Sequence, residues 1–270
     1  MSLERPAPPY YVGVDVGGTN VKVGVVSHDG TSLSKVRVPT EARQGPEAGL
    51  ENIYRAVEQA VAKSSLTIDD VLAIGVATPG TMDIPAGMIL QPPNLPGWVN
   101  IPVRKLVSER FDKPAILQND ANAAAYGEYW VGAGRDAHSL VFWTLGTGIG
   151  CGIIVADMII QGEHSHGSEC GHIIIEMDGG RLCGTGQRGT LEAYAGANAL
   201  IQRCHEALSE GRESQLGEFV VRGEALTPLA IARAAEAGDA LADELIMETA
   251  RCMGIGTTTL MHTIDPSMVL

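Results

Sequence analysis

The sequence has little basic charge and no long apolar run. Its 270 residues include 19 lysines and arginines against 32 aspartates and glutamates, so the formal net charge is −13. A chain this acidic is a poor partner for polyanionic nucleic acid, although a local basic cleft for a nucleotide stays compatible with it. No apolar stretch approaches the roughly 20 residues that a membrane-spanning helix needs. We therefore expect neither a nucleic-acid partner nor a membrane partner.

Close cysteine pairs are also absent. The chain has five cysteines and no Cys-x-x-Cys. Scattered cysteines in an odd number favour a reducing compartment over a disulfide framework, so we expect a cytoplasmic protein. Residues 1–10 are rich in proline and lack the apolar core of a signal peptide, which predicts a flexible leader. Hydrophobic residues make up 45% of the chain, enough for a globular protein with a sizeable core.

Two stretches share one plan, in which a strand, a glycine-rich turn and a second strand follow one another. In residues 11–26 the valines alternate on both sides of a turn at residues 17–19, and residues 143–155 repeat the plan around a turn at residues 146–148. Neither is a Walker loop or a Rossmann fingerprint, because a strand follows the glycines. A plain hairpin also explains the first stretch taken alone. Its repetition predicts a duplicated domain with two phosphate-binding turns.

The rest of the chain alternates predicted strands and helices, which indicates an α/β fold. Further strands are expected at 32–38, 71–77, 115–117, 139–145 and 153–156, and helices at 46–63, 102–111, 121–130, 191–209, 228–237 and 240–263. We expect a small N-terminal α/β domain over residues 11–120 and a larger α/β domain over 121–270. The end, after Asp265-Pro266, resembles a strand cut short, so a C-terminal portion is expected to be missing.

Asp120 is the strongest single candidate for a catalytic residue. It follows a predicted buried strand and precedes a predicted helix, so its carboxylate can project into a cleft, but an aspartate here can equally be the N-cap of the helix. Asp15 stands just before the first glycine turn, where a carboxylate can hold a hydrated Mg²⁺. Lys22 follows the same turn and can meet a phosphate.

A polar set farther along the chain suits a polyhydroxylated ligand such as a sugar. Glu169 and Glu192 can accept hydrogen bonds from hydroxyls, His172 can donate one, and Asn119 can do both. The histidines and cysteines between residues 164 and 192 also suggest zinc. Without any Cys-x-x-Cys, however, a polar substrate loop explains that stretch better.

These motifs, in this order, resemble those of ROK-family sugar kinases (repressors, open reading frames and kinases), with a glucokinase-like pattern from Tyr11 to Leu270. The segments that carry the resemblance are Asp15-Val16-Gly17-Gly18-Thr19-Asn20, Thr78-Pro79-Gly80, Asn94-Leu95-Pro96-Gly97-Trp98, Asn119-Asp120-Ala121-Asn122-Ala123-Ala124-Ala125, Leu145-Gly146-Thr147-Gly148-Ile149-Gly150 and Glu169-Cys170-Gly171-His172. The resemblance implies the duplicated ribonuclease H-like fold of the actin-like ATPases, Hsp70 and hexokinase, with a cleft between the two domains.

The resemblance also implies roles for individual residues. Asp120 resembles the general base that takes a proton from the sugar hydroxyl. The residues that resemble sugar contacts are Gly80, Asn119, Asp120, Glu169, His172 and Glu192. The residues that resemble contacts to ATP and its Mg²⁺ are Asp15, Gly17, Gly18, Thr19, Asn20, Lys22, Gly146, Thr147 and Gly148.

The implied activity is an ATP-dependent hexose kinase, with glucose as the expected substrate, glucose 6-phosphate as the product and glycolysis as the setting. An N-acetylhexosamine kinase is the nearest alternative, and polyphosphate is an alternative phosphoryl donor. Another class is a sugar-responsive repressor or a non-catalytic sugar sensor of the same family. The acidic charge and the nine residues before Tyr10 argue against a DNA-binding role. Relatives commonly form homodimers or homotetramers, which we also expect here.

One segment departs from the family pattern. Many relatives carry Cys-x-Cys-Gly-x-x-Gly-Cys-x-Glu, whereas Thr185 and Thr190 replace two of those cysteines here. A neutral hydroxyl is a poor zinc ligand, so His172 and Cys183 are the only family ligands retained and we predict no structural zinc. A hydrogen bond is expected to orient His172 in place of the metal.

Overall fold

The computed structural model describes residues 7–92 and 94–270, so most of the predicted leader lies outside it. The chain forms two compact units, one of residues up to Asp136 together with 159–167, the other of residues 137–158 and 168–270. The sequence places the division at Asp120 instead. The difference arises because helix α3 (Asp120–Val131) packs on strands β4 (Val71–Thr78) and β7 (Ala115–Asn119) of the first unit.

The first unit contains a five-stranded sheet in the order β3-β2-β1-β4-β7. Strands β1 (Tyr10–Val16), β2 (Asn20–Ser27) and β3 (Ser32–Pro39) form an antiparallel meander, as the two turns in the sequence predict. Strand β4 runs parallel to β1, and β7 runs parallel to β4. The carboxyl ends of β1, β4 and β7 therefore meet at one edge of the sheet, where ligands of α/β proteins bind.

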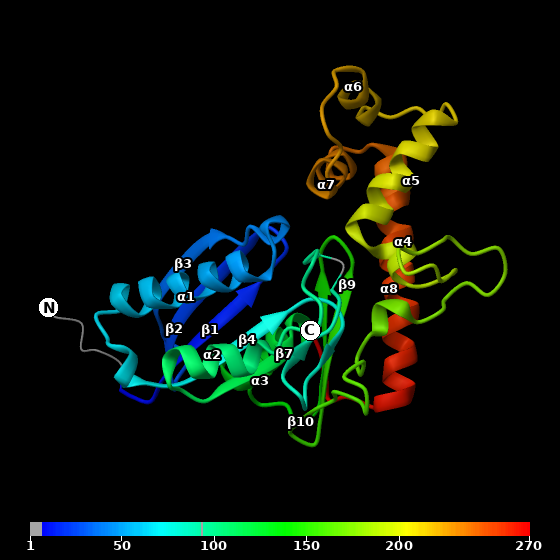
Figure 1. Ribbon diagram of the computed structural model, residues 1–270. Coiled ribbons are helices and arrows are strands. Elements are labelled where there is room, and N and C mark those ends of the chain that lie inside the picture. The colour runs from blue at the N-terminus through cyan, green and yellow to red at the C-terminus, as the bar shows by residue number, and fades with distance from the viewer. Residues whose placement is uncertain (1–6, 93) are drawn as a thin grey trace, which may run out of the picture. The chain divides into compact units, whose positions relative to one another are not determined.

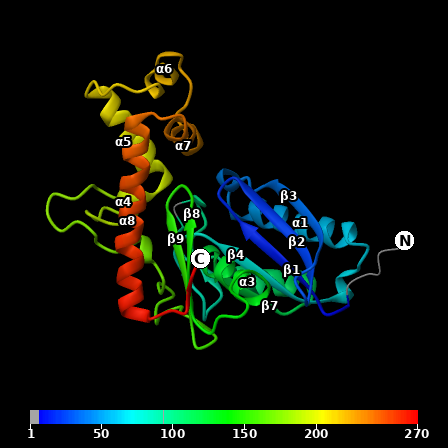
Figure 2. The ribbon, with the colours of Figure 1, turned by 180° about the vertical axis from the view of Figure 1, so that it is seen from behind.

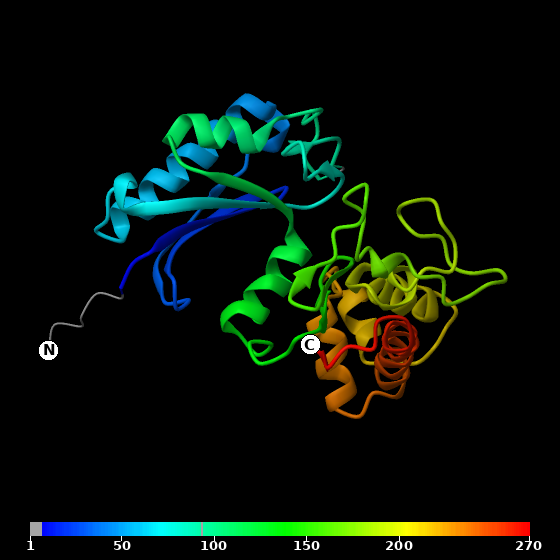
Figure 3. The same cartoon turned by 90° about the horizontal axis from the view of Figure 1, so that it is seen from below.

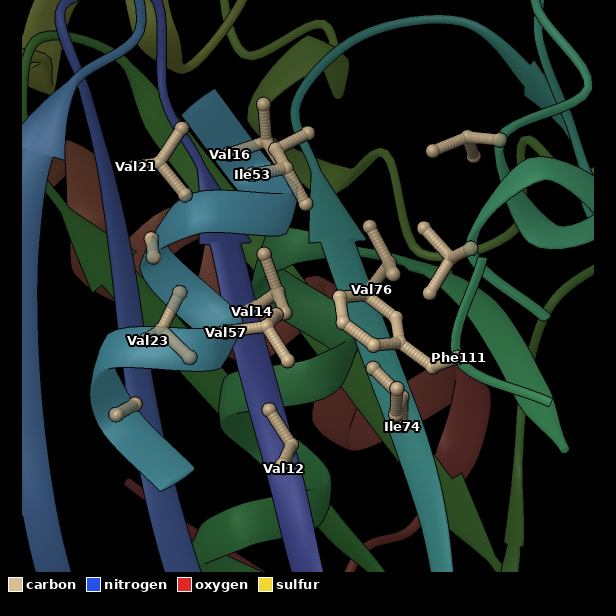
Figure 4. Close-up of a cluster of buried hydrophobic side chains, with 14 of the residues drawn as sticks. Val12, Val14, Val16, Val21, Val23, Ile53, Val57, Ile74, Val76 and Phe111 are labelled. Carbon is tan, nitrogen blue, oxygen red and sulfur yellow. The ribbon is translucent and has the colours of Figure 1, made fainter. Parts of the chain in front are cut away.

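One face of this sheet is covered by α1 (Pro46–Lys63) and α2 (Val103–Phe111), as Figures 1 and 3 show. Because side chains alternate along a strand, every second valine of the hairpin faces the helices. Figure 4 shows this core, whose labelled side chains are Val12, Val14, Val16, Val21, Val23, Ile53, Val57, Ile74, Val76 and Phe111. Short elements complete the unit: η1 (Ala42–Gln44), η2 (Ile68–Asp70) and the pair β5 (Met82–Asp83) and β6 (Met88–Ile89).

Trp98 is the largest fully buried side chain of this core and packs against Gly49 of α1, where a Cβ would overlap its ring. Replacing Trp98 by alanine is expected to lower the free energy of unfolding by about 3–5 kcal/mol, because the lost contacts leave a cavity. The neighbouring Val99 is 51% exposed, so Val99→Ala is the matched control and should change stability by less than about 0.5 kcal/mol. Urea unfolding of both variants checks this, and equal midpoints would contradict it.

The second unit contains a four-stranded sheet in the order β10-β9-β8-β11. Strands β8 (Leu140–Leu145) and β9 (Ile149–Val155) form the second antiparallel glycine hairpin, β10 (Met158–Ile159) flanks β9, and β11 (Met268–Val269) lies parallel to β8. The predicted strand at the end of the chain is thus confirmed. The order β10-β9-β8-β11 repeats β3-β2-β1-β4 of the first sheet, as the prediction of duplication requires.

Besides the loop of residues 173–191, helices make up most of the rest of the second unit. They are α4 (Glu192–Ala195), α5 (Ala197–Ser209), α6 (Leu216–Val221), α7 (Pro228–Glu236) and α8 (Ala240–Ile264), and the turn η3 (Cys170–His172) precedes them. Figure 2 shows α5 beside α8, whose apolar sides share a core with α7. The helix predicted over 191–209 is interrupted at Gly196, which adopts an extended backbone. None of the helices in the described ranges is long and apolar enough to cross a membrane.

Candidate functional site

The first glycine turn is held by hydrogen bonds to Thr40, the residue that follows β3. The Gly17 amide donates to the Asn20 carbonyl oxygen at 3.0 Å, and the Thr40 amide donates to the Thr19 carbonyl oxygen at 2.9 Å. The Thr40 hydroxyl also donates to the Gly17 carbonyl oxygen at 2.6 Å. Thr40 is fully buried, whereas Gly18 and Thr19 are exposed at the tip. The turn is therefore braced on one side and open to a ligand on the other.

Gly18 has a packing role as well as its predicted role beside a phosphate. A Cβ at this position would lie 2.6 Å from the carbonyl oxygen of Asn94, in the proline-rich loop of the same unit. Such an overlap forces one of the two backbones to move. Packing within the first unit therefore requires glycine at position 18, whether or not a phosphate binds there.

Asp15 and Lys22 are paired with each other across the first hairpin. The Lys22 Nζ donates to the Asp15 carboxylate at 2.9 Å, and 62% of the lysine side chain and 44% of the aspartate side chain are exposed. An exposed pair of this kind contributes about 0–1 kcal/mol. Exchanging the partners for a cation and a phosphate therefore costs little.

Asp120 is the first residue of α3, but the N-cap of that helix is Asn119. The Asn119 Oδ1 accepts from the amides of Ala121 at 2.9 Å and Asn122 at 3.1 Å. Burial raises the pKa of Asp120 above its ordinary value, the Ala121 amide opposes that rise, and the Asp15 carboxylate adds to it. Asp120 is also exposed to solvent, so the burial that raises its pKa is incomplete. Of the two roles that the sequence left open, helix capping belongs mainly to Asn119.

Gly80 lies at the same edge of the sheet. It has a φ of 84°, which favours glycine, and it follows the buried end of β4. Thr78, the last residue of β4, pairs with Asn119 in the register of β4 and β7. Its hydroxyl is buried and has no hydrogen-bond partner. The first unit thus brings Asp15, Gly80, Asn119 and Asp120 to the carboxyl ends of β1, β4 and β7.

In the second unit, Glu192 links the second glycine turn to the predicted sugar residues. One of its carboxylate oxygens accepts from the Ile149 amide at 2.9 Å, and the other accepts from the Cys183 thiol at 3.4 Å. The Cys183 sulfur lies 4.0 Å from Nδ1 of His172. Glu169 is exposed at the start of η3. Cys183 therefore sits between His172 and Glu192, where the sequence predicts an orienting hydrogen bond.

The second glycine turn is closed by the Gly146 amide, which donates to the Gly148 carbonyl oxygen at 3.0 Å. The Ala197 amide, at the start of α5, donates to the Gly146 carbonyl oxygen at 3.0 Å. Gly146 and Thr147 are exposed, as predicted phosphate contacts must be. A Cβ on Gly148 would overlap the Glu192 carboxylate.

Gly148→Ala is expected to displace the Glu192 carboxylate and to lower kcat/KM by about 10²-fold, the cost of a misplaced positioning group. Gly254→Ala in α8 is the matched control, because a Cβ there meets no atom within 4 Å. Steady-state kinetics of the two variants checks this. If both variants retain the kcat/KM of the parent, the position of the Glu192 carboxylate does not depend on the absence of a side chain at residue 148.

The zinc prediction concerns His172, Cys183 and Glu192. Their potential ligand atoms lie within 4.8 Å of one another, and no other such group was found in the described ranges. Thr190, where relatives have a cysteine, is buried, and its hydroxyl accepts from the Ala193 amide at 3.3 Å. Thr185 is exposed. One thiol, one imidazole and one carboxylate are three potential ligands, one fewer than a structural zinc site has, so the absence of zinc stays a prediction.

A groove of about 960 Å³ runs along the sheet face that α1 and α2 leave uncovered. Residues of β1, β2, β3, β4 and β7 line it, and α3 borders it through Tyr126 and Trp130. Only Asp15 and Lys22, at its end, belong to the predicted site. The groove is mainly apolar and, apart from Asp15 and Lys22, is not lined by the polar groups described above.

Comparisons with known proteins agree with this arrangement. Residues 11–270 match the ROK family. A glucokinase of Halalkalibacterium halodurans is 33% identical over 261 residues, which make up 97% of this chain and 79% of that protein. A xylose repressor of Caldicellulosiruptor bescii is 29% identical over 259 residues, 96% of this chain and 64% of the repressor.

A solved structure extends the comparison to the fold. The ROK family glucokinase from Streptomyces griseus in complex with glucose and AMPPNP is 33% identical, with a TM-score of 0.79 over 97% of this chain and 82% of that one. The chain has the actin-like ATPase fold of these kinases, which confirms the predicted fold class. With a family match over nearly its whole length, the chain belongs to the ROK family.

Proposed function

We propose that the chain is an ATP-dependent glucokinase, which transfers the γ-phosphoryl group of ATP to glucose and forms glucose 6-phosphate. The observation that carries the proposal is the position of Asp120 at the carboxyl end of β7, beside the charge of Asp15 and with Asn119 as the main helix cap. The similarity to glucokinases at 33% identity supports the choice of reaction and of sugar.

Asp120 accepts the proton of the attacking sugar hydroxyl. A carboxylate whose pKa is raised above its ordinary value is a better base than a fully solvated one. The Asn119 side chain fixes the start of α3, so the backbone that carries the base is rigid. Positioning of this kind supplies much of the rate in phosphoryl transfer.

The two glycine turns hold the phosphates of ATP through their backbones. The tips at Gly18 and Gly146 are exposed, and each turn is braced by a hydrogen bond from a neighbouring element. Asp15 offers the hard oxygen ligand that Mg²⁺ prefers, and the ion neutralises phosphate charge when it is bound. Lys22 then exchanges Asp15 for a phosphate oxygen, which the weak exposed pair permits.

The sugar hydroxyls are bound by Glu169, His172 and Glu192, together with Asn119 and the Gly80 backbone. Glu192 accepts hydrogen bonds from the Ile149 amide and the Cys183 thiol, so its carboxylate is oriented before sugar arrives. A preoriented acceptor loses little entropy when it binds a hydroxyl. Such acceptors also reject sugars that lack the matching hydroxyl.

Two alternatives keep the same site. An N-acetylhexosamine kinase differs only in the sugar, and a polyphosphate-dependent kinase differs only in the phosphoryl donor. A sugar-responsive regulator is the alternative of another class, and the similarity to a xylose repressor favours it. It requires sugar binding without phosphoryl transfer, whereas the base and both turns favour catalysis.

The test is ADP release by the chain with Mg-ATP over glucose, mannose, fructose, N-acetylglucosamine and N-acetylmannosamine. Turnover that is fastest with glucose is the expected result. Turnover only with an acetylated sugar would replace the substrate and keep the mechanism. Sugar binding by calorimetry, without turnover on ATP or polyphosphate, would overturn the kinase proposal in favour of a sensor.

A further inference from the structure

Gln118 lies in β7, directly before the two residues that form the predicted site at the start of α3. Strand β7 stands at the end of its sheet and, in the described ranges, pairs only with β4, so part of its backbone has no strand partner. The Gln118 Oε1 accepts from the Asn119 amide at 2.8 Å. The side chain of Gln118 therefore binds the backbone of the residue that caps α3.

The same oxygen atom also reaches the first turn of α3. The Asn122 Nδ2 donates to it at 3.4 Å. In turn, the backbone amide of Asn122 donates to the Asn119 Oδ1 at 3.1 Å. The side chains of Gln118 and Asn119 thus both connect the end of β7 with the first turn of α3. We call Gln118, Asn119 and Asn122 the junction brace.

Asp120 is attached to the junction brace through the Ala121 amide. This amide donates to the Asp120 Oδ1 at 2.9 Å and to the Asn119 Oδ1 at 2.9 Å. One N–H group is thus shared between the proposed base and the helix cap. Because the junction brace fixes the direction of that N–H group, a shift of the brace also moves the acceptor oxygen of Asp120.

Stability alone does not explain the asparagine in the junction brace. Asn122 is 3% exposed, and its Oδ1 is buried without a hydrogen-bond partner in the described part of the chain. A buried polar atom without a partner lowers stability, and alanine is a better helix former than asparagine. What asparagine adds at this position is the hydrogen bond from its Nδ2 to Gln118.

We propose that Gln118 is a positioning residue for phosphoryl transfer, which holds Asp120 against the attacking hydroxyl through the junction brace. The proposal rests on the proposed function, in which Asp120 is the general base. Gln118 bonds to Asn119 and Asn122 and acts on Asp120 through them. A reacting group misplaced by about 1 Å can cost about 10²-fold in rate, so the loss of one part of the brace is expected to cost about 10-fold.

The kinetic test replaces the acceptor oxygen and keeps the length of the side chain. Gln118→Met is expected to lower kcat by about 10-fold and to change KM for glucose and ATP by less than about 3-fold, because the loss falls on alignment in the transition state. Gln118→Glu keeps an acceptor oxygen and should restore most of the lost kcat. An unchanged kcat in Gln118→Met, or a higher KM with the kcat of the parent, would overturn the proposal.

A matched control is available in the same unit. Gln44 is exposed in η1, so Gln44→Met makes the same chemical change away from the junction brace and should leave kcat and KM unchanged. Melting curves show whether each variant is folded. A fall in kcat as large in Gln44→Met as in Gln118→Met would show that the loss is not specific to the brace.

Hydrogen exchange tests the junction brace without any activity measurement. In the free chain, Gln118→Met should speed amide exchange over residues 119–122 by up to about 10-fold, the effect of one lost hydrogen bond, and should leave α1 unchanged. Gln118→Glu should keep the protection of the parent. Equal exchange in Gln118→Met and the parent would overturn the brace. If the parent turns over no sugar, the proposed function fails and the positioning role with it, while exchange still decides whether Gln118 holds the junction.

Asn122→Ala tests the second half of the brace, and it replaces Gln118→Met if that variant fails to fold. Alanine removes the Nδ2 donor and should also lower kcat with little change in KM. Since both changes break the same hydrogen bond, the double variant should lose less kcat than the product of the two single losses. Losses that multiply fully would show that Gln118 does not act through Asn122.

Discussion

Asp120→Asn is expected to lower kcat and kcat/KM by about 10²- to 10⁴-fold, the usual contribution of a general base. Asparagine has nearly the same shape and can occupy the same place at the start of α3, but it cannot accept the hydroxyl proton. Glucose affinity, measured by calorimetry, should change by less than about 3-fold, because the loss falls on the transition state rather than on substrate binding.

The stability of this variant separates lost catalysis from misfolding. The folded state raises the pKa of Asp120, mainly through burial, so between the ordinary value of 3.8 and the raised value the folded chain binds more protons than the unfolded chain. Stability from this group therefore falls as pH rises through that window. Above it the ionised carboxylate is a small cost, which asparagine removes. The melting temperature of Asp120→Asn at neutral pH should thus equal or slightly exceed that of the parent.

The raised pKa also sets the acidic limb of the rate profile. Because the base must be ionised, kcat/KM should begin to fall at a pH above 3.8, the ordinary value for an aspartate. Asp69→Asn is the matched control, since Asp69 is exposed in η2 of the same unit, at the opposite end of β4. Asp69→Asn should keep both the kcat/KM of the parent and the pH at which kcat/KM begins to fall. An Asp120→Asn variant with full turnover would remove Asp120 from the mechanism.

From the sequence, Asp120 could be a base or the N-cap of the helix, and the pattern alone does not show which side chain caps the helix. Asparagine and aspartate are equally good N-caps, and Asn119 and Asp120 follow one another directly. The choice depends on the backbone: Asn119 has φ −64° and ψ 145°, the extended conformation that an N-cap needs. That conformation follows from the end of β7 in the sheet. Local pattern alone carries no such information.

Contacts between distant segments were the main features that the sequence could not reveal. Thr40 bonds to Gly17 across 23 residues, and no motif marks it. The six-residue α6 gives too short a periodic pattern to detect. By contrast, the two hairpins and α1 were predicted well, because alternation and a helix that begins at a proline are local signals. The position of Cys183 beside His172 was likewise visible only once the loop was folded.

Glu192→Ala is expected to lower kcat/KM for glucose by at least about 10²-fold. The carboxylate accepts from the Ile149 amide at 2.9 Å and from the Cys183 thiol at 3.4 Å, so alanine removes a proposed sugar contact together with the link between the second turn and Cys183. Hydrogen bonds to a charged group contribute about 1.5–3 kcal/mol each, and every 1.4 kcal/mol is tenfold. Steady-state kinetics and glucose calorimetry measure the loss.

A second readout tests the link itself. Without the Glu192 acceptor, the Cys183 thiol loses its hydrogen-bond partner, and its reaction with N-ethylmaleimide in the folded chain should quicken. Glu192→Gln keeps an amide oxygen that can still accept from Ile149, so it should retain more sugar affinity than alanine. Glu210→Ala removes an exposed carboxylate at the end of α5 and should change neither measurement. Unaltered glucose affinity in Glu192→Ala, with the chain folded, would remove this residue from the sugar site and leave it as a brace for the second glycine turn.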